Sequence, residues 1–323
     1  MSAMEKRTHM CGELTASEIG QRVVLKGWAQ KVRNLGGIIF VWLRDRAGIV
    51  QIVLDVNRLS KEQFELAESI RGEYVLSVEG EVSRRAADAI NPKLKTGEVE
   101  VMVSDLQVLN TAKTPPIYIE EGTNEQEAIR LKYRYLDLRR PSMQDMLRFR
   151  HKVIATLRDY VDGQGFVEVE TPILTKSTPE GARDYLVPAR VKPGTFYALP
   201  QSPQQYKQLL MVAGLDRYYQ VARCFRDEDG RADRQPEFTQ FDMEMSFINE
   251  EDIQTVVEGA YQQLFRDVMG IELTLPLPRM TWRDAMARYG SDKPDTRYGL
   301  EIQTVNETVA GCGFQVFETA LEQ

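Results

Sequence analysis

One charged segment, RCFRDEDGRADRQPEFTQFDMEMSF at residues 223–247, contains the side chains best suited to chemistry. Arg226 supplies a fixed cation whose planar fork can bind phosphate oxygens in a bidentate manner. Phe238 offers an aromatic face on which a base can stack. Asp227 and Glu228 can accept hydrogen bonds from an exocyclic amine, hold a metal ion or simply face water. The segment therefore predicts either a nucleotide clamp or a solvated hairpin, and its spacing alone does not separate the two.

The second arm of this segment, residues 238–247, predicts the strand that positions these groups. Its side chains alternate between two faces, with apolar Phe241, Met243, Met245 and Phe247 on one and polar Gln240, Asp242, Glu244 and Ser246 on the other. We expect the first face to pack against a core and the second to hold a polar ligand.

Residues 195–212 predict a strand followed by a helix whose first turn can bind an anion. Ser202 is the expected N-cap, Pro203 the first helical residue and Gln205 the partner in a capping box. Amide dipoles at the helix start, together with Lys207, favour a negatively charged ligand. A capped surface helix with a solvated lysine is the alternative.

The loop at 176–183, KSTPEGAR, joins Pro and Gly punctuation to a single carboxylate, Glu180. Its plain interpretation is an ordinary surface loop.

The first third of the chain predicts a small β-barrel. The expected strands are 23–32, 38–44, 49–55, 74–82 and 99–109, with a short helix at 61–70 between the third and the fourth. This order is typical of an OB-fold, whose face and loops often bind single-stranded nucleic acid. Arg33, Phe40 and Gln51 would bring a cation, an aromatic platform and an amide into one neighbourhood. A purely structural barrel remains the alternative.

Composition indicates a soluble protein with two or more domains, because 323 residues with 42% hydrophobic content exceed one ordinary core. No long apolar run predicts a membrane span or a signal peptide, so a cytoplasmic protein is expected. The net charge of −7 is unevenly distributed: residues 1–113 hold 16 Lys and Arg against 15 Asp and Glu, and the remainder holds 25 against 33. Cys11, Cys224 and Cys312 form no CxxC pair, so we expect three buried thiols and neither a disulfide framework nor a zinc site.

Between the barrel and the larger part, residues 110–127 have the composition of a linker. Residues 145–160 then show helical periodicity with Gly163 as a stop, and a strand that ends at Pro172 follows.

Residues 223–247 resemble motif 2 of the class II aminoacyl-tRNA synthetases, and their DEDGRADRQPEFTQ core resembles the bacterial aspartyl group of that family. The segments RYLDLRR, SPQQYKQLL and GWAQKVRNLGGIIFVWLRDRAGIVQIV extend the resemblance over nearly the whole chain. It implies an α+β protein in which a five-stranded OB-fold precedes a class II catalytic domain built on an antiparallel sheet. The implied reaction joins L-aspartate to tRNA(Asp) through an aspartyl adenylate, with ATP as substrate and Mg²⁺ as cofactor.

The resemblance also assigns roles to single residues. ATP would contact Arg226, Asp227, Glu228, Gln235 and Phe238, with Arg226 as the catalytic cation. Aspartate would contact Glu180, Gln204, Lys207, Arg226 and Asp242. The tRNA anticodon would contact Arg33, Phe40 and Gln51. The helix at 145–160 and its strand resemble motif 1, which implies a homodimer, with the motif proline at Pro172.

The resemblance covers only part of the family's pattern. Residues 282–300 resemble the start of the bacterial insertion domain, while motif 3, with an ATP-binding arginine and the metal-binding carboxylates, has no counterpart here. We therefore expect no metal ligand in this chain and no aminoacylation by residues 1–323 alone. The expected domains are an OB-fold at 1–110, a hinge at 111–144, an incomplete catalytic domain at 145–290 and the start of the insertion domain at 291–323.

Two other functions remain open from the sequence. A related asparaginyl or lysyl synthetase would share the barrel and the hairpin, although Lys207 fits an acidic substrate better. A non-catalytic tRNA-binding fragment or paralogue would also carry these segments. Whether tRNA(Asn) is charged as well cannot be read from the residues.

Overall fold

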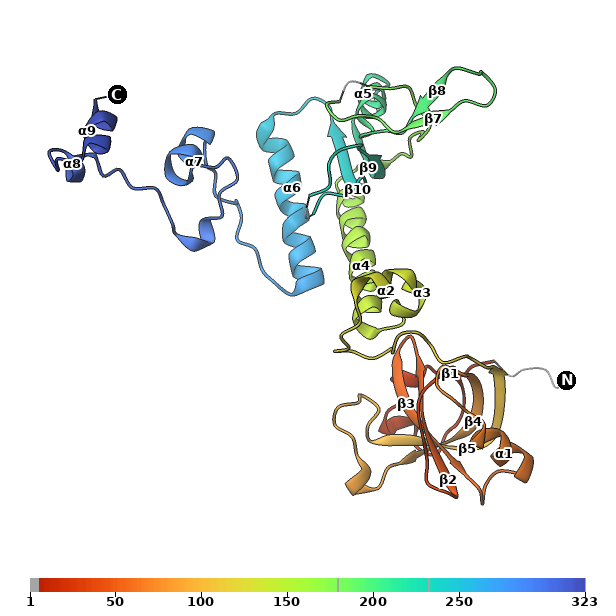
Figure 1. Cartoon of the computed structure of the whole chain (residues 1–323). Coiled ribbons are helices and arrows are strands. Elements are labelled where there is room, and N and C mark those ends of the chain that lie inside the picture. The colour runs from red at the N-terminus through yellow and green to blue at the C-terminus, as the bar shows by residue number, and fades with distance from the viewer. Residues whose placement is uncertain (1–5, 179, 232, 323) are drawn as a thin grey trace. The chain divides into compact units, whose positions relative to one another are not determined.

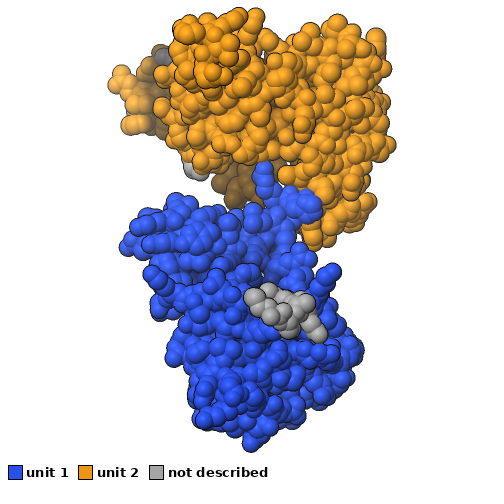
Figure 2. Space-filling view, turned by 90° about the vertical axis from the view of Figure 1, so that its right-hand side faces the viewer, with its two compact units in different colours: residues 1–151 blue, residues 152–323 orange. Residues whose placement is uncertain are grey.

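The computed structural model of the chain describes residues 6–178, 180–231 and 233–322. The chain forms two compact units, residues 1–151 and 152–323 (Figure 2).

Unit 1 is built on a closed barrel of five strands in the order β1-β2-β3-β5-β4 (Figure 1). The strands are β1 (Arg22–Asn34), β2 (Ile38–Asp45), β3 (Gly48–Asp55), β4 (Val75–Arg84) and β5 (Val99–Asn110); α1 (Lys61–Glu68) and the short turns η1 (Cys11–Glu13), η2 (Ala16–Glu18) and η3 (Ala87–Ala89) complete the barrel. Each strand end lies within two residues of the sequence prediction. The OB-fold prediction is therefore confirmed in order and in extent.

Close backbone contacts allow the barrel to close. β3 and β5 pair in parallel, while the other neighbours are antiparallel. At Gly27 in β1 an added Cβ would lie 2.3 Å from the carbonyl oxygen of Arg44, and at Gly80 in β4 it would lie 2.3 Å from that of Met102. Only glycine fits where another backbone approaches so closely.

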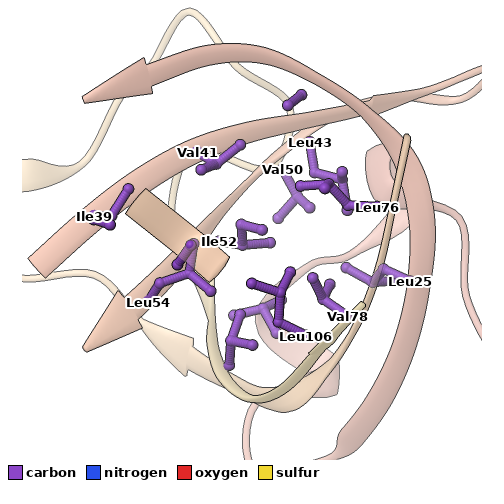
Figure 3. Packing of buried hydrophobic residues seen from close by; sticks show 14 of the residues in the cluster. Leu25, Ile39, Val41, Leu43, Val50, Ile52, Leu54, Leu76, Val78 and Leu106 are labelled. Carbon is purple, nitrogen blue, oxygen red and sulfur yellow. The ribbon is translucent and has the colours of Figure 1, made fainter. Parts of the chain in front are cut away.

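The barrel interior is filled by alternate side chains of all five strands (Figure 3). Ile39, Val41 and Leu43 of β2 face Val50 and Ile52 of β3 in this core, and all of them are fully buried. The period of two that predicted the strands is the same feature that fills the core, because every second side chain points inward.

A folded connector follows the barrel within unit 1. It contains α2 (Glu127–Lys132), α3 (Arg134–Asp137) and the first part of α4 (Pro141–Gly163). Asp137 is fully buried and forms ion pairs of 3.0 Å with Arg130 and with Arg134. Arg139 forms an ion pair of 2.7 Å with Glu73, which comes directly before β4. The Asp137 pairs thus hold the connector together, and the Arg139–Glu73 pair attaches it to the barrel.

Unit 2 contains a three-stranded sheet in the order β10-β9-β6. Its elements are β6 (Val167–Glu168), β7 (Leu186–Pro188), β8 (Phe196–Ala198), α5 (Gln204–Val212), β9 (Arg217–Phe225), β10 (Glu237–Met245), α6 (Glu250–Leu264), η4 (Phe265–Met269), α7 (Trp282–Tyr289), η5 (Thr296–Tyr298), α8 (Asn306–Val309) and α9 (Gln315–Leu321). β9 and β10 are antiparallel, and β6 pairs with β9 in parallel. Phe241, Met243 and Met245 pack against the buried cluster of this unit, as the alternation in β10 predicts.

Three details differ from the sequence predictions. β10 ends at Met245, so Phe247 lies beyond the strand with a φ of 55° and is 96% exposed. The apolar alternation of the sequence continues to Phe247, two residues beyond the end of the strand. Cys11 and Cys224 are buried, but Cys312 is exposed. The helix predicted at 145–160 is confirmed and is longer, as α4.

None of the described helices combines the length and the apolar character needed to cross a bilayer.

Candidate functional site

The turn between β9 and β10 forms a pocket of about 360 Å³. It is lined by Arg226, Glu228, Asp229, Asp233, Arg234, Gln235 and Phe238. Four of the five residues predicted to contact ATP, namely Arg226, Glu228, Gln235 and Phe238, are therefore brought together. Asp227 does not line the pocket; its backbone N–H donates to the carbonyl oxygen of Arg183 at 3.0 Å.

Arg226 and Phe238 face each other across this pocket. The guanidinium carbon of Arg226 lies 5.1 Å from the ring centroid of Phe238, a cation–π arrangement. The Arg226 backbone N–H donates to the carbonyl oxygen of Pro236 at 2.9 Å, which closes the base of the hairpin. A flat ring and a planar cation are therefore held side by side in the pocket, where the ring can contact a base and the cation a phosphate.

Sequence reasoning missed the pocket contribution of Arg234, whose guanidinium lies 4.0 Å from the carboxylate of Glu228. The signal was present, because the loop RADRQPEF carries two further arginines beyond Arg226. In the sequence, charged side chains on a loop are expected to be solvated. Only the folded hairpin shows that Arg234 lines a pocket.

A second group of charges surrounds Lys207 on α5. Its Nζ lies 2.9 Å from Oδ1 of Asp242 and 3.2 Å from Oε2 of Glu244, both on the polar face of β10. Burial opposes the charged form of Lys207, but the two carboxylates outweigh it, so the lysine pKa lies above its ordinary value. Glu244 was predicted only as a polar-face residue. Its position two residues after Asp242 was the signal that both reach the same cation.

The pKa of Asp242 is raised above its ordinary value, first because the carboxyl is buried. Lys207 opposes this shift, while the negative charges of Glu244 and Glu180 add to it. Two carboxylates therefore contact the ammonium group of Lys207, and the charge of a third, Glu180, also acts on Asp242. A site with this excess of negative charge is suited to a ligand that carries its own ammonium group.

Glu180 is held at the edge of this group by two hydroxyls. Ser202 Oγ donates to Glu180 Oε2 at 2.6 Å, and Thr178 Oγ1 donates to Oε1 at 3.0 Å. The predicted capping box on α5 is wrong, because Pro203 is the N-cap and α5 begins at Gln204. Ser202 precedes the N-cap, and its Oγ accepts from the backbone N–H of Gln204 at 3.3 Å while it donates to Glu180.

Gln201 joins the two groups and was not predicted. Its fully buried amide accepts from the backbone N–H of Ala182 at 3.1 Å and donates to Asp184 Oδ1 at 2.5 Å. Its backbone carbonyl lies 3.5 Å from a guanidinium nitrogen of Arg226. Continuous contacts thus run from Arg226 through Gln201 and its neighbour Ser202 to Glu180.

The barrel carries a separate pocket of about 530 Å³. It is lined by Lys31, Arg33, Leu35, Phe40, Trp42, Gln51, Arg85, Ala89 and Asn91. All three residues predicted to contact an anticodon are brought together, because Arg33 of β1 is paired with Phe40 of β2 and Gln51 of β3 with Trp42. Gln51 also donates to Glu100 Oε2 at 2.8 Å, which fixes the orientation of its amide.

Arg85 is the main residue of this pocket that the sequence prediction missed. Only 4% of its surface is exposed, its Nε donates to the carbonyl oxygen of Val99 at 2.9 Å, and its buried Nη2 has no hydrogen-bond partner among the described residues. Burial lowers its pKa below the ordinary value. Buried polar groups are normally satisfied, so this nitrogen marks a place where a ligand acceptor is needed.

Comparisons with known proteins agree with this architecture. A model of the OB-fold nucleic acid binding domain matches residues 23–109, and a model described as tRNA synthetases class II (D, K and N) matches residues 126–312. The chain is 60% identical over 319 residues to the aspartate–tRNA(Asp/Asn) ligase of Bacillus cytotoxicus, covering 99% of this chain and 54% of that protein. It is 58% identical to the ligase of the same name from Moorella thermoacetica, covering 98% of this chain and 52% of that protein.

Among solved structures, asparaginyl-tRNA synthetase from Pyrococcus horikoshii, complexed with asparaginyl-adenylate, superposes with a TM-score of 0.72 at 27% identity. The match covers 83% of this chain and 59% of that one. The chain spans about half the length of the curated relatives it matches. Since the class II match alone covers more than half of its residues, this chain, with an OB-fold followed by a synthetase domain, belongs to the class II tRNA synthetases of the D, K and N group.

Proposed function

We propose that this chain supplies the sites at which an aspartate–tRNA ligase binds ATP, L-aspartate and tRNA(Asp). The aspartate α-carboxylate would attack the α-phosphorus of ATP and release pyrophosphate, and the aspartyl group would then pass to the terminal ribose of the tRNA. The observation that supports it most directly is the row of contacts from Arg226 through Gln201 and Ser202 to Glu180, which links a nucleotide pocket to an amino-acid pocket.

Both reacting groups are anions, so the reaction needs cations and alignment more than a strong base. In this proposal the Arg226 fork bridges the α-carboxylate and the α-phosphate. Phe238 stacks on the adenine ring and Glu228 accepts a hydrogen bond from the adenine amine. Gln235 contacts the nucleotide further along, and the role of Asp227 in ATP binding stays a prediction.

The amino-acid pocket supports an acidic substrate. Lys207 has three N–H donors, and its two carboxylate neighbours leave one for the side-chain carboxylate of aspartate. Glu180 and Asp242 would accept from the substrate ammonium group, and Gln204, at the start of α5, would help to hold the amino acid. A neutral side chain, as in asparagine, would leave the buried lysine charge without this partner.

ATP would bring Mg²⁺ with it, and the ion would neutralise charge on the phosphates. Within residues 6–178, 180–231 and 233–322 no group of three or more His, Cys, Asp or Glu is arranged to hold a metal. None of the described side chains is therefore proposed as a ligand of this ion.

The barrel pocket is proposed to bind the anticodon. Phe40 would stack on a base, and Arg33 and Gln51 would contact base edges or phosphates. The names of the two bacterial relatives include both tRNA(Asp) and tRNA(Asn), so charging assays with each tRNA would decide the second substrate.

A homodimer and a cytoplasmic site of action complete the proposal. The motif 1 region, α4 and β6, exposes Met146, Leu147, Phe149 and Val167, which are apolar side chains that a second copy would cover. Sedimentation of a monomer at micromolar concentration would contradict the dimer.

A binding experiment on the purified chain tests the central proposal. A non-hydrolysable aspartyl-adenylate analogue is titrated by calorimetry into the wild type and into Arg226→Ala. The variant should bind roughly 10- to 150-fold more weakly, because hydrogen bonds to charged groups contribute about 1.5–3 kcal/mol. Arg266→Ala is the matched control, since it removes an exposed arginine that is paired with Asp267 on η4.

Equal affinity of the wild type and Arg226→Ala for the analogue would overturn the proposed role of this pocket. An asparaginyl-adenylate analogue that binds as tightly as the aspartyl one would favour the asparaginyl alternative. Absence of binding to either analogue would favour a non-catalytic RNA-binding protein.

A further inference from the structure

The hairpin formed by β7 and β8 carries an exposed surface that the nucleotide and amino-acid pockets do not use. Leu186 pairs with Ala198, Val187 with Tyr197 and Pro188 with Phe196. Figure 1 shows the hairpin as a separate two-stranded ribbon in unit 2. Ala198 at its base is buried, but most of the other side chains of the two strands are not.

The side chains of this hairpin are a mixture of apolar groups and cations. Val191 at the tip is 80% exposed and Phe196 is 57% exposed, and Leu186 and Tyr197 are also exposed. Arg190 and Lys192 are exposed as well, and neither has an ion-pair or hydrogen-bond partner for its side chain among the residues that the structure describes. No Asp or Glu occurs from residue 185 to residue 215, although acids outnumber bases in this part of the chain.

The tip that carries these cations is an ordered turn. The backbone N–H of Thr195 donates to the carbonyl oxygen of Lys192 at 3.1 Å, and its hydroxyl donates to the same oxygen at 2.7 Å. Ala189 N–H donates to Thr195 carbonyl at 3.0 Å, and Gly194 has a φ of 82°, which glycine adopts without strain. The two cations are thus presented on a rigid support, which reduces the entropy lost on binding.

The base of the hairpin is attached to the nucleotide pocket. On the side leading into β7, the carbonyl of Arg183 accepts from the N–H of Asp227 at 3.0 Å. On the side leaving β8, the carbonyl of Pro200 accepts from the N–H of Phe225 at 2.9 Å. Both arms are therefore bonded next to Arg226. The base of the ribbon therefore lies beside the pocket that contains Arg226.

We propose that the β7–β8 hairpin binds the RNA substrate next to its 3′ end. Arg190 and Lys192 would contact backbone phosphates, and the exposed rings of Phe196 and Tyr197 would pack against sugars or unpaired bases. Exposed aromatics beside unpaired cations, on a segment without acids, are complementary to RNA in both charge and surface. The inference rests on the proposed function, because that function brings the RNA 3′ end to the pocket.

Binding of an RNA stem-loop with a single-stranded 3′ end, followed by fluorescence anisotropy at several salt concentrations, tests this inference on the whole chain. Arg190→Ala/Lys192→Ala should weaken binding about tenfold and lower the slope of log Kd against log salt by about 2, one for each lost phosphate contact. Arg283→Ala/Lys293→Ala is the matched control, with the same change in net charge and two exposed cations of unit 2. The control should retain the wild-type slope.

The adenylate analogue is titrated into the same variants. Unchanged analogue binding with weakened RNA binding supports the hairpin site. Unchanged RNA affinity and salt slope in the hairpin variant would overturn the proposal. Dissociation of a dimer in sedimentation, with no effect on RNA binding, would overturn it as well, since the ribbon would then contact a second copy. In a further outcome, the wild type binds RNA through the hairpin and yet does not bind the adenylate analogue. That result would support the RNA contact and refute the proposed ligase function.

Discussion

The two pockets of this chain are built on supports of different kinds. The barrel pocket takes Arg33, Phe40 and Gln51 from three neighbouring strands of a closed sheet, whose core draws on every strand. The nucleotide pocket takes most of its lining from the loop between β9 and β10, on an open sheet of three strands. Strand pairing fixes the first set of side chains, on both sides for Phe40 and Gln51 and on one side for Arg33, whereas the loop residues of the second set have few such bonds.

This difference shows how each pocket can respond to its ligand. A pocket on a closed barrel is formed before binding, so it loses little entropy when a ligand binds. A pocket lined by loop residues such as Glu228 and Arg234, which form a pair at only 4.0 Å, can close around a nucleotide. The barrel pocket is thus suited to recognition, and the pocket between β9 and β10 is suited to chemistry that excludes water.

The largest effect that sharpens this comparison is expected from core truncation. Ile52→Ala, in the fully buried barrel core, should cost about 2–5 kcal/mol of unfolding free energy, more than about 0.8 kcal/mol for each carbon removed, because a cavity remains. Val256→Ala on α6 should cost less per carbon, since the smaller cluster around it can relax. Hydrogen exchange resolved for each unit measures both values. Equal costs per removed carbon would mean that the two cores are equally closed.

The same contrast explains what the sequence could predict. The barrel strands follow from alternation and glycine punctuation, because each inward side chain serves one continuous core. Phe247 continues the apolar alternation of β10 but lies in a turn, since φ of 55° ends the strand. Pattern alone cannot detect where the backbone leaves the sheet.

Site residues were predicted where a motif resemblance covered them, and missed where only tertiary structure assigns a role. Arg85 lies in the barrel pocket with an unpaired nitrogen, yet in the sequence it is one of two adjacent arginines. Ser202 has the correct residue type for a helix cap but donates to Glu180, which is 22 residues earlier. A contact between residues so far apart in the sequence is formed only in the folded chain.

An intermediate effect is expected from removing one aromatic ring in each pocket. Phe40→Ala should weaken binding of an anticodon stem-loop by about 1–3 kcal/mol, the usual contribution of one base–aromatic stack. Phe238→Ala should weaken binding of the adenylate analogue by a similar amount, because both the base stack and the cation–π contact with Arg226 are lost. Each variant serves as the control for the other. If one substitution weakened both ligands, the two pockets would not be independent.

The smallest expected effect is a difference in pH dependence between the two units. In unit 1, hydrogen bonds from Thr123 and then from Arg140 lower the pKa of Glu125 to about 2, so its stabilising contribution is lost as pH falls from about 4.5 towards 2. In unit 2, burial followed by the charges of Glu244 and Glu180 raises the pKa of Asp242 against the opposing effect of Lys207.

The sign for Asp242 is opposite to that for Glu125. The folded chain holds this proton more tightly than the unfolded chain, so the stability that Asp242 contributes is present below pH 3.8 and falls as pH rises through the folded pKa. Asp242→Asn, which cannot ionise, should therefore flatten the pH dependence of urea unfolding of unit 2 above pH 3.8. Glu125→Gln should flatten that of unit 1 below pH 4.5. Burial and then the charge of Asp242 raise the pKa of Tyr218 above its ordinary value. Tyr218 therefore ionises only at high pH and does not contribute to the pH dependence in the acid range. A slope in unit 2 that survives Asp242→Asn would show that Asp242 does not hold this proton, and the site would then meet its ammonium ligand with Asp242 already charged.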